Sequence, residues 1–168
     1  MLVAEKEIAA RVAELGRAIA RDYEETNLVL VGVLQGAFPF VADLMRTLPF
    51  DLTVDFVRTS SYGSGTTSSG TVRLVTDLSV DIADRPVLIV DDIVDTGHTL
   101  AALKRQLEGR GPRSVRTCVL LDKASRRETE VTIDYVGFTI PNVFVVGYGL
   151  DYDGLYRNLP HVATLDGI

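Results

Sequence analysis

The sequence predicts an α/β fold in which helices flank both faces of a mainly parallel sheet. Wholly apolar runs of strand length occur at Leu28–Leu34 and Val87–Val90. Strands that are apolar on both sides are typical of parallel sheets that are covered on both faces. These runs alternate along the chain with segments of helical periodicity, as in repeated strand–helix units. The 168 residues are enough for one domain with its own core.

The elements are expected in a regular order. Ile8, Val12, Leu15 and Ile19 are spaced by four, three and four residues, which predicts a first helix. After it we expect a strand at 28–34, a helix at 38–48, a half-exposed strand at 51–56, strands at 72–76 and 87–90, a helix at 97–108, a strand at 114–121, and short strands at 133–136 and 143–146. The polar stretch Ser60–Thr71 is the one low-complexity segment, and it predicts a loop. No repeat or linker divides residues 1–168, so we expect a single domain with a mobile loop at about 60–71.

Composition argues against several classes of protein. The net charge is −6, so no basic face for general nucleic-acid binding is expected. Cys118 is the one cysteine, so there is no disulfide framework within the chain, and we expect a buried structural thiol. Charged residues occupy positions 5–7, where a signal peptide would be apolar, and no apolar run approaches the ~20 residues of a membrane span. We expect a cytoplasmic protein that binds neither nucleic acid nor membrane.

The most informative segment is Val87–Leu100. Its apolar strand runs directly into two adjacent acids, Asp91 and Asp92, and then into Asp95, a Thr-Gly turn and a helix start. In open α/β sheets, ligands bind outside the carboxyl ends of the strands, and a helix N-terminus there favours a phosphate. The alternative is that Asp95 or Thr96 caps the helix and the first two acids are solvated. Two acids directly after a buried strand repel each other unless a cation or hydroxyl group offsets them, which favours a ligand site.

Residues 87–99, Val-Leu-Ile-Val-Asp-Asp-Ile-Val-Asp-Thr-Gly-His-Thr, resemble the phosphoribosyl-pyrophosphate motif of the type I phosphoribosyltransferases. The acid at Asp95 is typical of their 6-oxopurine branch, the hypoxanthine-guanine enzymes. Most of these begin the motif with Glu-Asp, where this chain has Asp91-Asp92. The resemblance extends from about Leu28 to Leu165. It implies the type I phosphoribosyltransferase fold, with a small hood formed by the terminal segments.

Four further segments carry the resemblance. Residues 32–38 resemble the pyrophosphate loop, which implies a cis bond between Leu34 and Gln35, and Gln35 stands where many relatives have Lys or Arg. Residues 54–63 resemble the start of the mobile loop. We expect sugar pyrophosphate and magnesium to bind first, and the loop to close only when both reactants or a charged analogue are present. Residues 120–127 resemble the purine-binding lysine segment, and residues 134–152 the base-binding and metal-binding segment. Each segment alone has an ordinary interpretation as a glycine turn, a polar connection, a surface lysine or a core phenylalanine.

The resemblance implies a role for each matching residue. Asp95 acts as general base or as hydrogen-bond partner of a purine ring nitrogen, and we expect it to be buried beside other acids under the closed loop. Phosphoribosyl pyrophosphate is expected to bind Asp91, Asp92, Thr96, Gly97, His98, Thr99, Leu34, Gln35, Gly36 and Arg157. The purine is expected to bind Lys123, Phe144 and Val145, and the loop to contribute Ser61 and Tyr62. Mg²⁺ is the expected cofactor, with Asp151, Asp91 and Asp92 at the metal.

The implied enzyme is a pentosyltransferase of purine salvage. It joins hypoxanthine or guanine to 5-phosphoribosyl 1-pyrophosphate and gives IMP or GMP and pyrophosphate. Preference for xanthine stays open. The resemblance implies that main chain near Val145 and Asp151 recognises the purine 2-substituent, so side chains give little information on this preference. The rival of another class is an RNA-binding regulator, which needs a basic face and usually lacks an acid at the position of Asp95. The expected partners are the small-molecule substrates and further copies of the chain, in a dimer or a tetramer.

Overall fold

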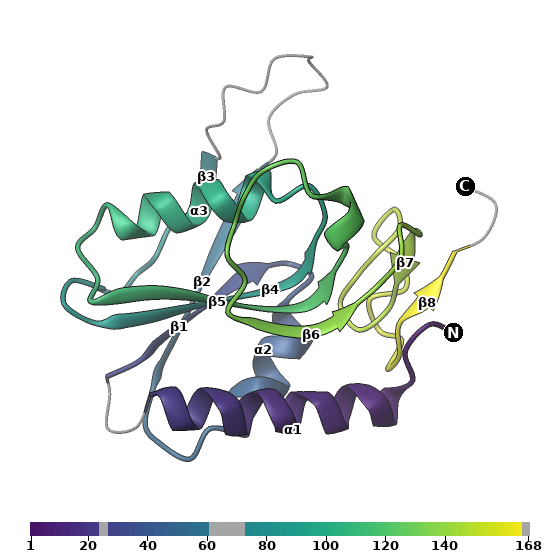
Figure 1. Ribbon diagram of the computed structural model, residues 1–168, viewed down its shortest axis with the longest axis horizontal. Helices are drawn as coiled ribbons and strands as arrows, with labels where there is room; N and C mark the ends of the chain where they lie inside the picture. Colours follow the sequence, from purple (N-terminus) through teal and green to yellow (C-terminus); the bar gives the residue numbers. More distant parts are fainter. Residues whose placement is uncertain (24–26, 61–72, 166–168) are drawn as a thin grey trace.

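The computed structural model describes residues 1–23, 27–60 and 73–165, and it has the predicted α/β architecture (Figure 1). The strands of the main sheet are β1 Val29–Leu34, β2 Thr53–Ser60, β3 Arg73–Thr76, β4 Pro86–Val94, β5 Ser114–Asp122 and β6 Tyr135–Thr139. They lie in the order β3-β2-β1-β4-β5-β6. All neighbours are parallel except β2 and β3, which are antiparallel. The prediction of a mainly parallel sheet is confirmed.

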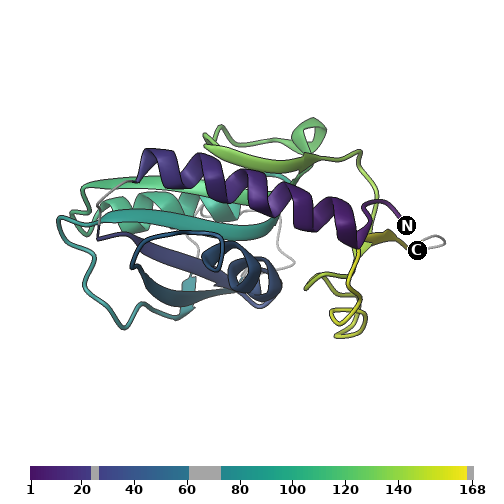
Figure 2. The same cartoon turned by 90° about the horizontal axis from the view of Figure 1, so that it is seen from below.

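Helices cover both faces of this sheet. α1 Glu5–Asp22 and α2 Phe38–Met45 lie on one face, and α3 His98–Glu108 lies on the other (Figures 1 and 2). Within the described ranges, no helix combines the length and apolarity that a membrane span requires. Successive residues of a central strand belong to different cores: Leu88 packs with the α1 side and Ile89 with the α3 side. The apolar runs are continuous because both strand faces are buried.

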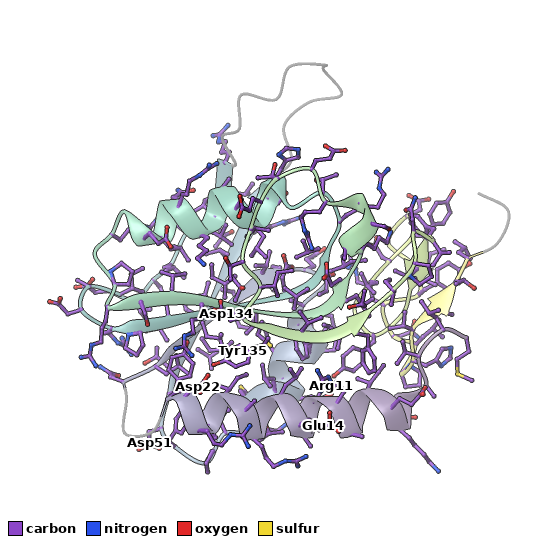
Figure 3. The ribbon with its side chains drawn as sticks, viewed as in Figure 1. Arg11, Glu14, Asp22, Asp51, Asp134 and Tyr135 are labelled. Carbon is purple, nitrogen blue, oxygen red and sulfur yellow. The ribbon has the colours of Figure 1, made fainter. Side chains whose placement is uncertain are left out.

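α1 is fastened to β6 at the edge of the sheet. Arg11 donates to the main-chain oxygens of Val136 and Gly137, at 2.7 and 2.9 Å. The Tyr135 hydroxyl donates to Asp22 at 2.5 Å (Figure 3). These contacts join the first helix to the last strand of the main sheet, from which the chain continues toward the hood.

β4 is longer than the sequence predicted. Asp91 and Asp92 were expected to follow the strand, but they are part of it, because pairing with β5 continues to Val94. The two charges interrupt the apolar run, so periodicity alone ended the strand at Val90. The acids are therefore fixed by the sheet's hydrogen bonds and do not lie in a free loop.

Other boundaries differ by a few residues. α2 ends at Met45 and not near residue 48, since Thr47 bonds the Leu44 carbonyl at 2.7 Å and starts a turn before Pro49. β6 covers 135–139, later than the predicted 133–136, because the Asp134 carboxylate accepts from the Thr117 main-chain N–H at 2.8 Å. The last predicted strand is shorter, and a strand at 163–164 was not predicted. Strands this short carry almost no periodicity.

The terminal segments form the predicted hood, which consists of residues 2–4 and 144–165. β7 Val145–Val146 pairs antiparallel with β8 Ala163–Thr164, and Val3 bridges to Val162. Figures 1 and 2 show the N-terminus beside this small sheet. Gly149, at φ +98°, lies so close to Gly36 that an added Cβ would be 1.9 Å from its carbonyl oxygen. The hood therefore packs directly on the loop that follows β1.

Candidate active site

Two adjoining cavities lie at the carboxyl ends of β1 and β4. The smaller, of about 130 Å³, is lined by residues that include Asp91, Asp95, Thr96, Gly97 and Thr99. The larger, of about 310 Å³, is lined by residues that include Leu34, Gln35, Gly36, Asp91, Asp92, Thr99, Asp151 and Arg157. Asp91 and Thr99 line both cavities. The structure thus brings together most of the residues that the sequence assigned to a sugar phosphate and a pyrophosphate.

The turn between β4 and α3 is shaped by Gly97. Its φ of +90° favours glycine, and an added Cβ would lie 2.9 Å from the Thr129 carbonyl oxygen. The turn is held by the Thr96 carbonyl, which accepts from the N–H groups of Glu128 and Thr129 at 3.0 and 3.1 Å. The turn places the first N–H groups of α3 at the smaller cavity, where they suit a phosphate.

The His98 side chain is turned away from this role. Its Nδ1 lies 2.5 Å from the Thr129 hydroxyl and its Nε2 lies 3.1 Å from the Glu128 carboxylate. The imidazole is therefore paired with the segment that follows β5. Binding of a ligand by the His98 main chain in this turn stays a prediction.

Asp91, which is buried, and Asp92, which is partly buried, form an acidic pair. The Asp92 main-chain N–H donates to Asp91 at 3.0 Å, and the Ile93 N–H donates to Asp92 at 2.8 Å. Burial and the adjacent Asp92 charge raise the pKa of Asp91 well above its ordinary value. Burial raises the pKa of Asp92 too, against the opposing effects of its hydrogen bonds and the charge of Arg157. The pair is costly in the free protein, which is typical of a site completed by a cation or hydroxyl groups.

We expect Asp91→Asn to stabilise the free protein at neutral and alkaline pH. The folded pKa of Asp91 lies above the unfolded value of ~3.9, so wild-type stability falls as pH rises through this window and stays lowered above it. Asparagine removes the charge and keeps an oxygen that can accept from the Asp92 N–H. Thermal unfolding without metal should show a higher Tm for Asp91→Asn at pH 8 and a small difference near pH 4. An equal difference at both pH values would contradict this.

Two cations contact the Asp95 carboxylate. Lys123 Nζ lies 3.6 Å from Oδ2, and Arg126 Nε donates to Oδ1 at 3.0 Å. The Asp95 side chain is 42% exposed and its neighbours are basic. Its expected burial beside other acids depends on the closed loop, most of which lies outside the described residues. Lys123 is only 7% exposed, which rules out the alternative of a surface lysine. A buried ammonium that faces a cavity acid is a strong candidate for ligand recognition.

The hood contributes the remaining predicted residues. Phe144 is 45% exposed, so it is not a core residue. Its ring contacts that of Tyr152 edge to face, with 5.7 Å between the ring centroids. Val145 is buried in β7. Asp151 pairs with Arg157 at 2.7 Å, and Arg157 also donates to the Gly149 carbonyl at 2.6 Å. Asp151 and Arg157 therefore line the larger cavity as an ion pair.

The loop after β1 carries the predicted cis bond between Leu34 and Gln35. The Gln35 side chain is neutral and exposed. Among the residues that line the larger cavity, the one cation is Arg157, against three acids. A polyphosphate would therefore meet net negative charge in this cavity unless a metal cation accompanied it.

The acids of the larger cavity suit magnesium. Asp91, Asp92 and Asp151 offer carboxylate oxygens, the donors that Mg²⁺ prefers. Within the described ranges, no three acidic, histidine or cysteine side chains already form a closed metal cluster. Mg²⁺ usually keeps several waters and takes phosphate oxygens from its substrate, so the residues present fit a metal that is bound together with a phosphorylated ligand.

Ser61 and Tyr62, the predicted lid residues, lie outside the described residues, as does most of the loop at 60–71. Sequence reasoning missed Arg126, which contacts Asp95, and Arg127, which pairs with Asp122. The available signal was the concentration of three cations directly after β5.

Comparisons with known proteins agree with this geometry. The phosphoribosyl transferase domain family matches residues 1–153. The chain is 51% identical over 172 aligned positions to the hypoxanthine-guanine phosphoribosyltransferase of Mycobacterium bovis, covering 99% of this chain and 85% of that one. It is 49% identical to the hypoxanthine phosphoribosyltransferase of Salmonella typhimurium, covering 98% and 94%. The crystal structure of a hypoxanthine phosphoribosyltransferase from Staphylococcus aureus has a TM-score of 0.95 and 43% identity, covering 98% and 90%.

Proposed function

This chain belongs to the phosphoribosyltransferase family, and we propose that within it the protein is a magnesium-dependent purine salvage enzyme. It joins hypoxanthine or guanine to 5-phosphoribosyl 1-pyrophosphate and releases IMP or GMP and pyrophosphate. The observation that carries the proposal is the buried Lys123, whose Nζ lies 3.6 Å from Asp95 Oδ2. Asp95 lines the smaller cavity together with Asp91 of the acidic pair and with residues of the turn that leads from β4 into α3 (95–98), which we call the phosphate turn. An ammonium and a carboxylate side by side match the 6-oxo oxygen and a protonated ring nitrogen of one purine.

The sugar phosphate binds at the end of β4. Its 5-phosphate accepts from the main-chain N–H groups of Thr96, Gly97, His98 and Thr99, where the helix dipole favours an anion. Asp91 and Asp92 accept hydrogen bonds from the ribose hydroxyls. The support is that both acids and the turn line the same small region of the two cavities.

The pyrophosphate binds in the larger cavity. Main chain of Leu34, Gln35 and Gly36 lines one side and Arg157 the other. Asp151 is the hood's ligand for magnesium, and Asp91 and Asp92 are the ligands from the sheet. When bound, Mg²⁺ neutralises charge on the leaving pyrophosphate. Arg157 must exchange Asp151 for phosphate oxygens, which frees that carboxylate.

The purine binds between Lys123 and the hood. Lys123 donates to the 6-oxo oxygen, Phe144 stacks on the ring, and Val145 main chain pairs with the ring edge. The bond from the anomeric carbon to pyrophosphate breaks, and its electron pair leaves with the pyrophosphate. A ring nitrogen then supplies the pair for the new bond. Asp95 accepts the hydrogen bond of the other ring nitrogen and takes or shares its proton.

We also propose the chain's wider context. Residues 1–168 act as one domain, and the segment 60–71, with Ser61 and Tyr62, closes over the reactants. The enzyme works in the cytoplasm as a homodimer or homotetramer. Light scattering of the purified protein distinguishes the two assemblies from a monomer.

The experiment that tests the function is product analysis. Purified protein is incubated with phosphoribosyl pyrophosphate, hypoxanthine and Mg²⁺, and IMP and pyrophosphate are quantified. Equal amounts of the two products are expected, with none after the metal is chelated. The same assay with guanine measures GMP, and failure to form either IMP or GMP under any metal condition would overturn the proposal.

A methyl group at Gly36 is expected to damage sugar pyrophosphate binding. An added Cβ would lie 1.6 Å from the Asp92 Oδ2 atom, so Gly36→Ala forces that carboxylate out of place. A displacement of this size at a binding group raises KM for phosphoribosyl pyrophosphate by roughly tenfold or more. Gly109→Ala is the matched control, because its Cβ would meet no atom closer than 3.5 Å. A KM equal to that of the control would show that Asp92 does not bind the sugar.

A further inference from the structure

The chain that follows β5 is joined to the phosphate turn along several residues. The Lys123 main-chain N–H donates to the Val94 carbonyl at 2.9 Å, and the N–H groups of Glu128 and Thr129 donate to the Thr96 carbonyl. The loop after the short helix η1, Ala124–Arg126, therefore arches over the start of α3 (Figure 1). The two segments that carry Lys123 and Asp95 form one connected unit.

Arg127 lies at the centre of this unit. One guanidinium nitrogen, Nη2, is paired with the Asp122 carboxylate, and the other, Nη1, donates to the Asp95 carbonyl oxygen at 3.2 Å. The two paired side chains are only 19% and 12% exposed. The Arg127 Cδ also fills the space beside Gly97, where an added Cβ would lie 2.9 Å from it. A single side chain thus contacts the end of β5, the phosphate turn and the main chain of Asp95.

The consequence concerns the two residues that face the purine. Asp122 immediately precedes Lys123, and the carbonyl that Arg127 contacts is that of Asp95 itself. Because a planar guanidinium can bond two acceptors in a fixed geometry, it sets the distance between the two segments. The side chains that emerge from them are 3.6 Å apart, between Nζ and Oδ2.

We propose that Arg127 is a positioning residue, which holds Asp95 and Lys123 at the spacing where both reach one edge of the same purine. The proposal rests on the proposed function for its substrate, but the arrangement itself is a property of the free protein. Arg126 differs, because it contacts the Asp95 carboxylate, the group that the purine needs. Among the described residues, the Arg127 guanidinium bonds main chain and Asp122, so it can stay in place when the purine is bound.

The test compares one single and one double variant. Arg127→Met removes both bonds and keeps an unbranched side chain beside Gly97, but it leaves the Asp122 carboxylate buried and unpaired, which lowers stability. Asp122→Asn combined with Arg127→Met removes both charges, so most of the lost Tm should return. The contact with the Asp95 carbonyl stays absent in both variants. Arg110→Met is the matched control, since Arg110 pairs with Asp77 at 2.7 Å outside the two cavities.

We expect kcat/KM for hypoxanthine to fall roughly a hundredfold in Arg127→Met, the scale of a small misplacement of catalytic groups. The double variant should regain most of the lost Tm, but its kcat/KM should stay within threefold of that of the single variant. The kcat/KM of Arg110→Met should lie within threefold of the wild-type value. Arg127→Lys should recover only part of the activity, since an ammonium lacks the planar fork. If kcat/KM and Tm both returned in the double variant, Arg127 would have a purely structural role and the proposal would be overturned.

Hydrogen exchange separates this proposal from the proposed function. Amides of residues 95–99 are expected to exchange faster in the double variant than in wild type. In Arg110→Met their exchange rates should equal those of wild type. This measurement needs no substrate, so it stands even if wild type forms no nucleotide. Equal exchange in the double variant and wild type would overturn the positioning role whatever the reaction is.

Discussion

Asp95→Asn is expected to lower kcat by roughly a hundredfold or more, the usual scale for losing an acid–base group. Asparagine keeps an oxygen that can accept from Arg126 Nε, as Asp95 does now at 3.0 Å, so the fold should be kept. It cannot accept a proton from the purine. The KM for phosphoribosyl pyrophosphate should change little, since the phosphate turn is held by main-chain bonds that the substitution leaves intact.

Asp51→Asn is a suitable control for this variant. Asp51 is exposed and lies at the opposite end of the molecule from the hood (Figure 3). Steady-state kinetics and circular dichroism of both variants separate a catalytic defect from misfolding. Turnover of Asp95→Asn within a few-fold of wild type would exclude Asp95 as the acid–base group.

Lys123→Met is expected to abolish the enzyme's discrimination between an oxygen and an amino group on the purine. An ammonium only donates, so it favours the 6-oxo oxygen of hypoxanthine over the 6-amino group of adenine. Loss of a charged hydrogen bond of about 1.5–3 kcal/mol should lower kcat/KM for hypoxanthine by roughly tenfold to a hundredfold. The activity with adenine should not fall in parallel.

The matched control is Lys104→Met, a half-buried lysine of α3 that contributes to neither cavity. Hypoxanthine and adenine are compared as competing substrates for wild type and both variants. The ratio of the two kcat/KM values is the quantity to follow. An unchanged ratio in Lys123→Met would mean that another group reads the purine 6-position.

The parts of the fold that the sequence predicted well are those buried on both faces. β1 and the first residues of β4 read as continuous apolar runs because their side chains alternate between two cores. The end of β4 was missed for a related reason. Asp91 and Asp92 occupy strand positions that line the larger cavity, where packing no longer dictates apolar residues.

The geometry of the candidate site was predictable where it depends on local sequence, and it was missed where it depends on distant contacts. Gly97 and the α3 start follow each other along the chain, so their turn was predictable. The contact of Arg127 with the Asp95 carbonyl joins positions 32 residues apart, and no periodicity reports it. The burial of Lys123 likewise depends on how the loop after β5 folds back over the phosphate turn.

Resemblance to a family supplied roles that physical reasoning alone did not. Phe144 reads as a core residue in sequence, yet its ring is 45% exposed. The partner of its edge contact, Tyr152, directly follows Asp151. The proposed stacking residue thus contacts the neighbour in sequence of the proposed metal ligand, an arrangement that depends on the folded hood.

We propose that Lys123 and Asp95 together select 6-oxopurines for transfer to a sugar pyrophosphate. This proposal is tested most directly by steady-state kcat/KM values for hypoxanthine, guanine, xanthine and adenine, with phosphoribosyl pyrophosphate and Mg²⁺ in excess. We predict that hypoxanthine, guanine or both are used efficiently, and that adenine is disfavoured by roughly a hundredfold or more, because the donor Lys123 would face its amino group. A kcat/KM for adenine equal to that for hypoxanthine would contradict this selectivity.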